Sequence, residues 1–408
     1  MPSTPLDGEP VPSDGSLPQA ALAELGERAF GLYVHVPFCT VRCGYCDFNT
    51  YTAEELGPAG GAPGASRATY AQAAVAEVRR ARRVLGERDL PVSTIFFGGG
   101  TPTLLSPEDL GSVVAAAAQE FGLAPGVEVT TESNPDSVDA ASLERLREVG
   151  INRVSFGMQS QVPHVLEVLD RTHDPRRVPA VVEWARAAGI EQVSLDLIYG
   201  TPGESQADWA TSVEAAVACE PDHVSAYSLI VEDGTALARR VRRGELPMPD
   251  EDDLADKYAL ADERLVAAGL GWYEVSNWST GAATRCRHNL LYWTGGDWWG
   301  VGPGAHSHVG GVRWWNVKHP AAYADRIGAD RSPAQAREVL GAEDRRVERV
   351  LLELRLREGL DVGVLDPAGR AAVPGLAARG LLVERAGRVA LTERARLLAD
   401  GVVRELLS

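Results

Sequence analysis

Three cysteines, Cys39, Cys43 and Cys46, lie close together in the stretch HVPFCTVRCGYC. Their C-x3-C-x2-C spacing lets one short loop hold three corners of a cubane iron–sulfur cluster, a [4Fe-4S] centre, which leaves the fourth iron open to an exchangeable ligand. The chain has two further cysteines, Cys219 and Cys286. A zinc site completed by Cys286 or a histidine is the alternative, although structural zinc sites more often pair C-x2-C knuckles.

Six short β-rich runs alternate with Ala-rich segments of helical period between about residues 30 and 235. This alternation predicts an α/β fold, and six such units predict a partial (β/α)6 barrel. Functional residues in barrels of this kind gather where the strands end. The cysteine loop follows the first run, and each of the next four runs also ends in an unusual motif. In chain order the runs are LYVHVPF, STIFFGGG, VEVTTES, RVSFGMQ, QVSLDLIYG and HVSAYSLIV.

The composition changes along the chain and divides it into four predicted parts. Residues 1–28 are rich in Pro, Ser, Gly and acidic residues, which predicts a disordered tail before the barrel core at 29–250. Residues 251–335 form an extension rich in aromatic residues and Gly. Residues 336–408 predict an α+β extension that includes a winged-helix-like module, with a hairpin turned at Ala386 and Gly387.

Charge and hydropathy exclude several classes of protein. The formal net charge is −17 at pH 7, so a general nucleic-acid coat, which needs a basic face, is not expected. No apolar run approaches the length of a membrane-spanning helix, and the N-terminus lacks the pattern of a secretory signal. Five cysteines with three in one loop favour a thiolate metal site in the reducing cytoplasm over a disulfide framework.

The cysteine loop and the glycine stretch together resemble the radical S-adenosylmethionine (SAM) superfamily. In that superfamily the amino and carboxylate groups of SAM occupy the open iron. Tyr45 matches the aromatic residue that flanks the adenine, and GGGTP at residues 98–102 matches the motif beside the methionine amino group. The motifs YVHVPFC, FFGGGTPT, TESNPD, SFGMQS and SLDLIYGTPGES more narrowly resemble the group that contains coproporphyrinogen dehydrogenase (HemN) and the haem chaperone HemW.

This resemblance, which runs from about residue 30 to the C-terminus, implies a set of SAM contacts at the strand ends. An Arg can pair with the SAM carboxylate, and acidic side chains can accept hydrogen bonds from its ammonium and ribose groups. The implied contacts are Tyr33, Tyr45, Phe48, Gly99, Gly100, Thr101, Glu132, Gln159, Arg171 and Asp196.

Two departures from the dehydrogenase pattern favour the HemW branch. Phe48 stands where the dehydrogenase has a further cysteine, and only 38 residues precede Cys39, too few for its N-terminal extension. The segment HNLLYW also matches the HNxxYW motif that is linked to haem binding in the HemW branch. The resemblance thus implies a haem site at His288, Asn289, Tyr292 and Trp293, with Cys286, His306 and His308 as alternative ligands.

The expected function is that of a haem chaperone that binds a [4Fe-4S] cluster, SAM and haem, without dehydrogenase activity. Its expected partners are haem-requiring acceptor proteins, such as respiratory enzymes, with at most peripheral membrane contact, no nucleic acid and a possible homodimer. Two alternatives stay open. One is the radical SAM dehydrogenase that oxidatively decarboxylates coproporphyrinogen III, and the other is a zinc-stabilised winged-helix regulator, which the acidic balance disfavours.

Overall fold

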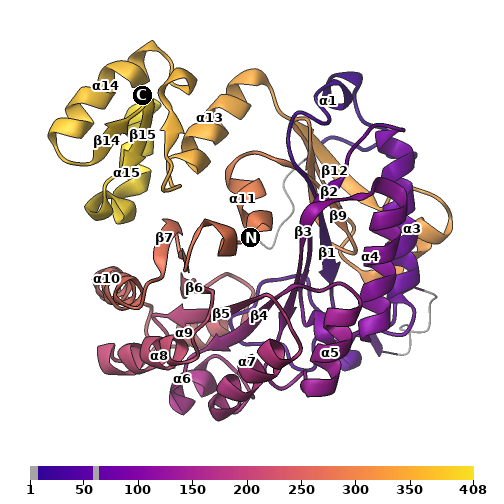
Figure 1. Cartoon of the computed structure of the whole chain (residues 1–408), viewed down its shortest axis with the longest axis horizontal. Helices are drawn as coiled ribbons and strands as arrows, with labels where there is room; N and C mark the ends of the chain where they lie inside the picture. Colours follow the sequence, from indigo (N-terminus) through magenta and orange to yellow (C-terminus); the bar gives the residue numbers. More distant parts are fainter. Residues whose placement is uncertain (1–7, 58–63) are drawn as a thin grey trace.

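One sheet of 12 strands forms the centre of the computed structural model, which describes residues 8–57 and 64–408. The middle of the sheet holds six parallel strands that are neighbours in chain order, and helices connect each to the next (Figure 1). The predicted partial (β/α)6 arrangement is therefore confirmed. The six strands are β1 (Phe30–Val36), β2 (Val92–Gly99), β3 (Leu123–Ser133), β4 (Arg153–Gln159), β5 (Gln192–Tyr199) and β6 (His223–Ser228).

Helices cover the outer face of these strands because alternate strand residues are apolar and point toward them. Leu32, Val34 and Val36 of β1 are fully buried in the main hydrophobic core. None of the described helices is long and apolar enough to cross a membrane. The helices in this part of the chain are α2 (Ala53–Leu56), α3 (Tyr70–Leu85), α4 (Pro107–Phe121), α5 (Ala140–Glu148), α6 (Pro163–Val168), α7 (Val178–Ala187), α8 (Gln206–Ala218) and α9 (Ala236–Arg242).

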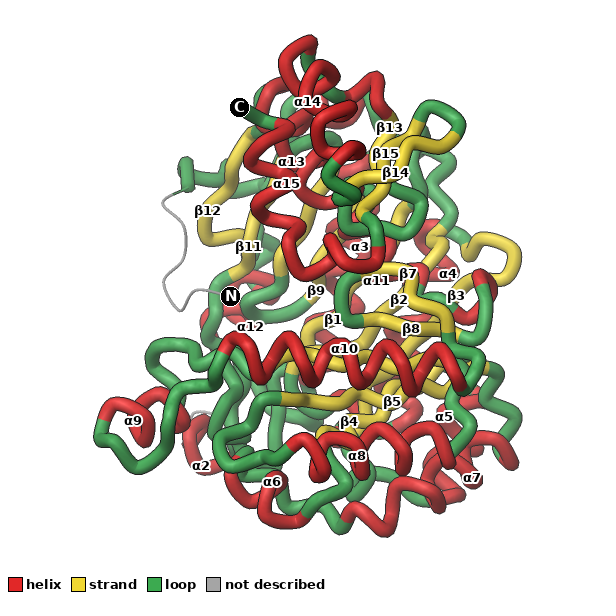
Figure 2. Tube along the Cα trace, turned by 90° about the vertical axis from the view of Figure 1, so that its left-hand side faces the viewer, coloured by secondary structure: helices red, strands yellow, loops and turns green. Residues whose placement is uncertain are grey.

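The aromatic extension does not form a separate layer, because its strands lengthen the sheet at both edges. Two of them continue the sheet beyond β6, and four continue it beyond β1. Figure 2 shows α10 crossing in front of the strands, where it packs on α8. The elements are α10 (Glu251–Ala267), β7 (Gly271–Glu274), β8 (Asn277–Ser279), β9 (Asp297–Val301), β10 (His306–Val309), β11 (Val312–Asn316), α12 (Pro320–Gly328) and β12 (Ala334–Val339).

Helix α11 (Arg287–Trp293) lies on the inner face of the sheet, opposite the covering helices (Figure 1). The helix approaches β1 closely because Gly31 has no side chain there: a Cβ atom on it would lie 2.6 Å from Leu291 Cδ1. The N-terminus of α11 is anchored by the buried carboxylate of Glu128, which accepts hydrogen bonds from the amides of Arg287 (2.9 Å) and His288 (3.0 Å). This HNLLYW helix is thus part of the packed interior.

The prediction of a disordered tail is wrong for residues 8–28. Glu9 forms a β-bridge with Arg337 of β12, and a short helix, α1 (Gln19–Ala23), follows. Val11 and Leu17 pack against the main core, so these apolar residues hold a segment whose composition otherwise predicts disorder. Residues 1–7 lie outside the described residues.

The C-terminal module has its own hydrophobic core and the predicted winged-helix-like architecture. Its hairpin turns at Ala386 and Gly387, both with positive φ, as the sequence predicts. The module begins after β12, which belongs to the large sheet, so the predicted boundary at residue 336 falls inside a strand. The elements are α13 (Ala342–Glu353), β13 (Leu360–Asp361), α14 (Pro367–Ala378), β14 (Leu382–Arg385), β15 (Arg388–Leu391) and α15 (Ala399–Leu406).

We expect Glu128→Ala to lower the free energy of unfolding by about 1–3 kcal/mol, because it leaves two amides of α11 without acceptors in the interior. Urea unfolding followed by tryptophan fluorescence measures this change. The matched control is Glu144→Ala on the exposed side of α5, for which we expect a change within about 0.5 kcal/mol. Equal effects of the two substitutions would show that Glu128 does not anchor α11.

Candidate functional site

The inner face of the parallel strands is partly open to solvent. Tyr33, Phe96, Glu132 and Asp196 are half-buried, and Tyr227 is 47% exposed, whereas their neighbours along each strand up to the carboxyl end are mostly buried. These five residues occupy the inner side of β1, β2, β3, β5 and β6. A ligand bound beside the strand ends therefore meets polar and aromatic side chains from five different strands.

The three cysteines of the loop after β1 are half-buried and unpaired. Burial, followed by the charges of the nearby Cys46 and Cys43, raises the pKa of Cys39 to about 11. Mutually repelling thiolates fit a cationic iron cluster, which would relieve that repulsion. In the part of the chain that the structure describes, no three His, Cys, Asp or Glu side chains converge on one point to hold a single metal ion. A four-iron cluster binds its three thiolates at separate corners and does not need that convergence.

The cysteine loop is held in place from two sides. On one side, the amide of Gly44 donates to the Leu169 carbonyl (3.2 Å), and the Gly44 carbonyl accepts from the amide of Leu237 at the start of α9 (2.8 Å). On the other side, the Asn49 side chain donates to the carbonyls of Pro303 (3.0 Å) and Lys318 (2.8 Å). The aromatic extension therefore supports the loop directly, although no sequence motif indicates this.

The glycine stretch packs onto the start of the cysteine loop. The amide of Gly100 donates to the Val36 carbonyl (2.8 Å), and a Cβ atom on Gly100 would lie 2.5 Å from the Phe38 carbonyl oxygen. The amide of the preceding Gly99 donates to the carboxylate of Glu132 (3.1 Å). Gly100 is thus required by the approach of two backbone segments, in addition to any approach by a ligand.

Arg171 connects the cysteine loop to the strand ends. One of its Nη atoms lies 3.7 Å from Cys43 Sγ, and the other donates to the Asn134 side chain (2.7 Å) and the Gly157 carbonyl (2.8 Å). Asn134 in turn donates to Thr101 Oγ1 (3.2 Å). Asn134 lies in the ESNP stretch, and sequence reasoning gave it no role. The structure shows that it joins two of the predicted SAM contacts.

Two of the predicted contacts are half-buried carboxyl groups that lie close enough to act on each other electrostatically. Burial, followed by the charge of Asp196, raises the pKa of Glu132 to about 8. Burial also raises the pKa of Asp196, although hydrogen bonds from Ser155 (2.9 Å) oppose this shift. At neutral pH Glu132 is therefore largely protonated until a cationic group, such as an ammonium, approaches it.

The remaining predicted contacts differ in their exposure. Tyr45, between two cysteines, packs against the small apolar cluster that includes Val165 and Leu169. Gln159 is buried at the end of β4 with a φ of 61°, and Phe48 is 55% exposed. Nine of the ten predicted contacts thus lie in the cysteine loop or along the inner strands and their carboxyl ends, and Arg171 reaches them from the loop after α6.

Comparison with known proteins is consistent with this arrangement. A family model described as the radical SAM superfamily matches residues 33–216. The heme chaperone HemW of Mycobacterium tuberculosis is 51% identical over 95% of this chain and 97% of that protein. The heme chaperone HemW of Bacillus subtilis is 33% identical over 91% and 97%, respectively. This chain belongs to the HemN/HemW group of the radical SAM superfamily.

This chain shares its fold with a solved structure named HemN. Coproporphyrinogen III oxidase (HemN) from Escherichia coli aligns with a TM-score of 0.80 and 22% sequence identity, over 97% of this chain and 94% of that one. At this identity the likeness shows a common fold. The C-terminal module and the extended sheet are therefore included in the shared architecture.

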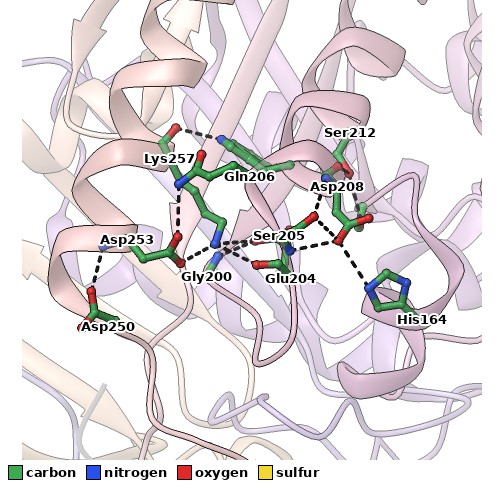
Figure 3. A network of polar contacts seen from close by, with 12 residues as sticks. His164, Gly200, Glu204, Ser205, Gln206, Asp208, Ser212, Asp250, Asp253 and Lys257 are labelled. Atoms are coloured by element: carbon green, nitrogen blue, oxygen red, sulfur yellow. Dashed lines mark hydrogen bonds and ion pairs between the residues drawn. The ribbon is translucent and has the colours of Figure 1, made fainter.

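The loop after β5 carries the GTPGES motif, and helix α10, which lies outside the barrel, holds this loop in place. Figure 3 shows Lys257 of α10 reaching toward this loop, where Nζ donates to the Glu204 carbonyl (3.0 Å) and pairs with Asp253. The Glu204 carboxylate accepts from the amide of Gly200 (2.7 Å). Lys257 is fully buried, so its charge is balanced by these carboxylates. The network positions the end of β5 and does not contact the cysteine loop.

The HNLLYW segment, for which the sequence predicts a haem site, is more enclosed than that prediction requires. His288 is buried, and its two ring nitrogens hydrogen-bond to Thr94 Oγ1 and Tyr292 Oη, each at 2.8 Å. Its ring stacks on the ring of Phe96, with 5.3 Å between the two ring centroids. Burial lowers the pKa of His288 to about 3. In this conformation His288 offers no open nitrogen to iron, contrary to expectation, because α11 packs into the sheet. Trp293 is half-buried.

Cys286 and Asn289 are likewise engaged in the interior. The Cys286 thiol lies 3.8 Å from the Glu128 carboxylate, and burial raises its pKa to about 12, so it is not an open ligand. The Asn289 side chain donates to Glu274 Oε1 (2.9 Å), while Glu274 Oε2 has no hydrogen-bond partner among the described residues. Glu274, on β7, had no sequence signal. Burial raises its pKa to about 8.

We expect Gly100→Ala to reduce cluster assembly, because the new Cβ atom would displace the carbonyl of Phe38 and with it the cysteine loop. The measurement is iron and sulfide content per chain after anaerobic reconstitution. Gly281→Ala is the matched control, because that glycine has an extended φ of −180° and nothing within 4 Å of its Cβ position. Full iron content in Gly100→Ala would show that the loop tolerates the displacement.

We expect Glu274→Gln to change how stability depends on pH. In the folded chain Glu274 stays protonated up to about pH 8, whereas an exposed glutamate ionises near 4.5. Between these values the unfolded state binds fewer protons, so Glu274 makes the free energy of unfolding fall as pH rises. The variant should therefore lose less stability than the parent between pH 5.5 and 8 in urea unfolding. Glu144→Gln, on an exposed helix face, should follow the parent, and an identical pH dependence in Glu274→Gln would contradict this assignment.

Proposed function

We propose that this chain is a haem chaperone of the HemW kind, which binds haem and delivers it to acceptor proteins. The supporting observation is the identity of 51% to a protein named heme chaperone HemW, across almost the full length of both chains. The alignment covers 95% of this chain and therefore extends well beyond residues 33–216, which the superfamily model matches. The sequence similarity behind this proposal therefore includes regions outside the barrel that the radical SAM superfamily shares.

The cluster and SAM belong to the same proposal. Cys39, Cys43 and Cys46 would hold the [4Fe-4S] cluster, and SAM would bind at its open iron. When bound, this pair can supply an electron to the SAM sulfonium. Arg171, whose guanidinium lies beside Cys43, would pair with the SAM carboxylate, and Glu132 would accept from its ammonium group. The half-exposed ring of Phe48 can cover the bound adenosyl group from the solvent side.

The second candidate function is that of a coproporphyrinogen dehydrogenase. The shared fold and the open inner face with its carboxyl groups are compatible with it. Phe48, which takes the place of the further cysteine, favours the chaperone. Residues 8–28 also do so, because they pack along β12 and the main core near the far edge of the sheet.

The proposal extends to location and partners. Thiolate ligands for iron require a reducing compartment, so we infer that the protein acts in the cytoplasm. The acceptors would be haem-requiring proteins, including respiratory enzymes that it visits by peripheral contact. We propose no nucleic-acid partner, since the net charge is −17. A homodimer is an additional proposal, which size-exclusion chromatography with light scattering would test.

We expect the anaerobically reconstituted protein to bind one haem per chain saturably and to transfer it to a haem-free acceptor, followed by absorbance. The same preparation should leave coproporphyrinogen III unchanged in the presence of SAM and a reductant. Absence of haem binding together with formation of the vinyl product would replace the chaperone with the dehydrogenase. A colourless preparation that retains zinc and no iron would support the zinc-stabilised alternative.

A further inference from the structure

Lys257 of α10 is a charged side chain that is fully buried. Its Nζ atom donates to the Glu204 carbonyl (3.0 Å), pairs with Asp253 and lies 3.8 Å from the Glu204 carboxylate. A well-packed apolar side chain of similar volume is often as stabilising as a buried ion pair, so stability alone does not account for this charge. The groups that Lys257 holds in place give a better reason for it.

Lys257 fixes the loop that follows β5. The amide of Glu204 donates to the Thr201 carbonyl (2.8 Å), which closes a tight turn beside the lysine. The Glu204 carboxylate accepts from the amide of Gly200 (2.7 Å), the residue directly after β5. Gly200 also packs against α10, because a Cβ atom on it would overlap the side chain of Leu254. The loop is thus held to α10 at both of its ends.

The strand that ends at this loop carries Asp196, one of the predicted SAM contacts. Strand β5 is hydrogen-bonded to β4 on one side and to β6 on the other. The backbone is extended from Asp196 to Tyr199, so no turn separates the Asp196 carboxylate from the anchored Gly200. The loop after β5 therefore helps to fix the position of this carboxylate on the inner face.

A second connection runs from α10 through α8 to the end of β4. The indole of Trp209 on α8 donates to the backbone carbonyl of Lys257 (2.8 Å). Further along α8, the Ser212 hydroxyl accepts from the amide of Gln161 (3.0 Å), just after the predicted SAM contact Gln159. Figure 3 shows Lys257 and Ser212 on opposite sides of one polar network. Helices α10 and α8 thus support two strand ends that carry predicted SAM contacts.

We propose that Lys257 is a positioning residue for SAM, which holds the loop after β5 so that Asp196 and, through α8, Gln159 are correctly placed. This inference rests on the proposed function and deepens it, because it extends the SAM site to a helix outside the barrel. Lys257 lies beyond residues 33–216, which the superfamily model matches. It touches neither SAM nor the cysteine loop, so it acts on SAM affinity and not on cluster assembly.

The test is equilibrium dialysis of labelled SAM against the full-length chain after anaerobic reconstitution. Lys257→Met keeps an unbranched side chain and removes the charge, and Asp253, which is 40% exposed, can bind water instead. We expect this variant to bind SAM about 10-fold more weakly at an unchanged iron content per chain, because the contacts of a ligand depend on exact placement. Arg264→Met is the matched control on the same helix, since Arg264 pairs at the surface with Glu214 (3.1 Å). We expect it to bind SAM as the parent does.

Two further variants separate positioning from a general loss of stability. Val350→Ala shortens a buried side chain in the separate core of the C-terminal module, so it should lower the thermal midpoint and leave SAM affinity unchanged. Ser212→Ala removes only the hydroxyl that holds the end of β4, and we expect it to weaken SAM binding in the same direction as Lys257→Met. This second variant tests the inference even where Lys257→Met does not fold. The electron paramagnetic resonance signal of the reduced cluster should respond to SAM in each variant, but at higher SAM concentrations than in the parent.

The outcomes distinguish this inference from the proposed function. If the parent binds no SAM, the proposed SAM site and this inference both fail. If the parent binds SAM and the folded variants Lys257→Met and Ser212→Ala bind it with the same affinity, this inference alone fails. Loss of iron together with SAM binding in Lys257→Met would also overturn it, because the lysine would then act on the cluster. Weaker SAM binding in Val350→Ala would reduce the effect to one of stability.

Discussion

A buried carboxylate, Glu128, holds α11 against the inner face of the sheet, and much of the site depends on this contact. The inner strand residues include polar groups that need partners once water is excluded. Glu128 satisfies the first amides of α11, and Thr94 satisfies His288. Because α11 occupies this part of the inner face, the strand ends near the cysteine loop remain the accessible part. The same packing removes His288 from solvent.

The cysteine loop shows how distant segments produce a local site. Its position depends on α9, on the turn after β9 and on the ends of β2 and β3, which are far apart in the chain. Arg171 and Asn134 join these parts through hydrogen bonds. A loop supported from several sides can hold three thiols in fixed positions despite their mutual repulsion. The hydrogen bonds that hold the loop are therefore as necessary to the site as the cysteines themselves.

The electrostatics of the inner face favour ligands that bring positive charge. Glu132, Asp196 and Glu274 all have a raised pKa because the surrounding protein shields their carboxyl groups from water. The strand ends near the cysteine loop thus suit a ligand that carries a positive charge, such as an ammonium group.

The sequence alone determined the six parallel strands, the place of the cysteine loop and the hairpin of the C-terminal module. Alternating apolar periodicity and turn residues act over short distances, and the local pattern records them. Tertiary structure decided where the aromatic strands pair, because either sheet edge accepts a short strand. It also decided that residues 8–28 are ordered, and that His288 is enclosed while His306 is exposed. Burial and hydrogen-bond partners depend on contacts between distant segments, which a motif of six residues does not contain.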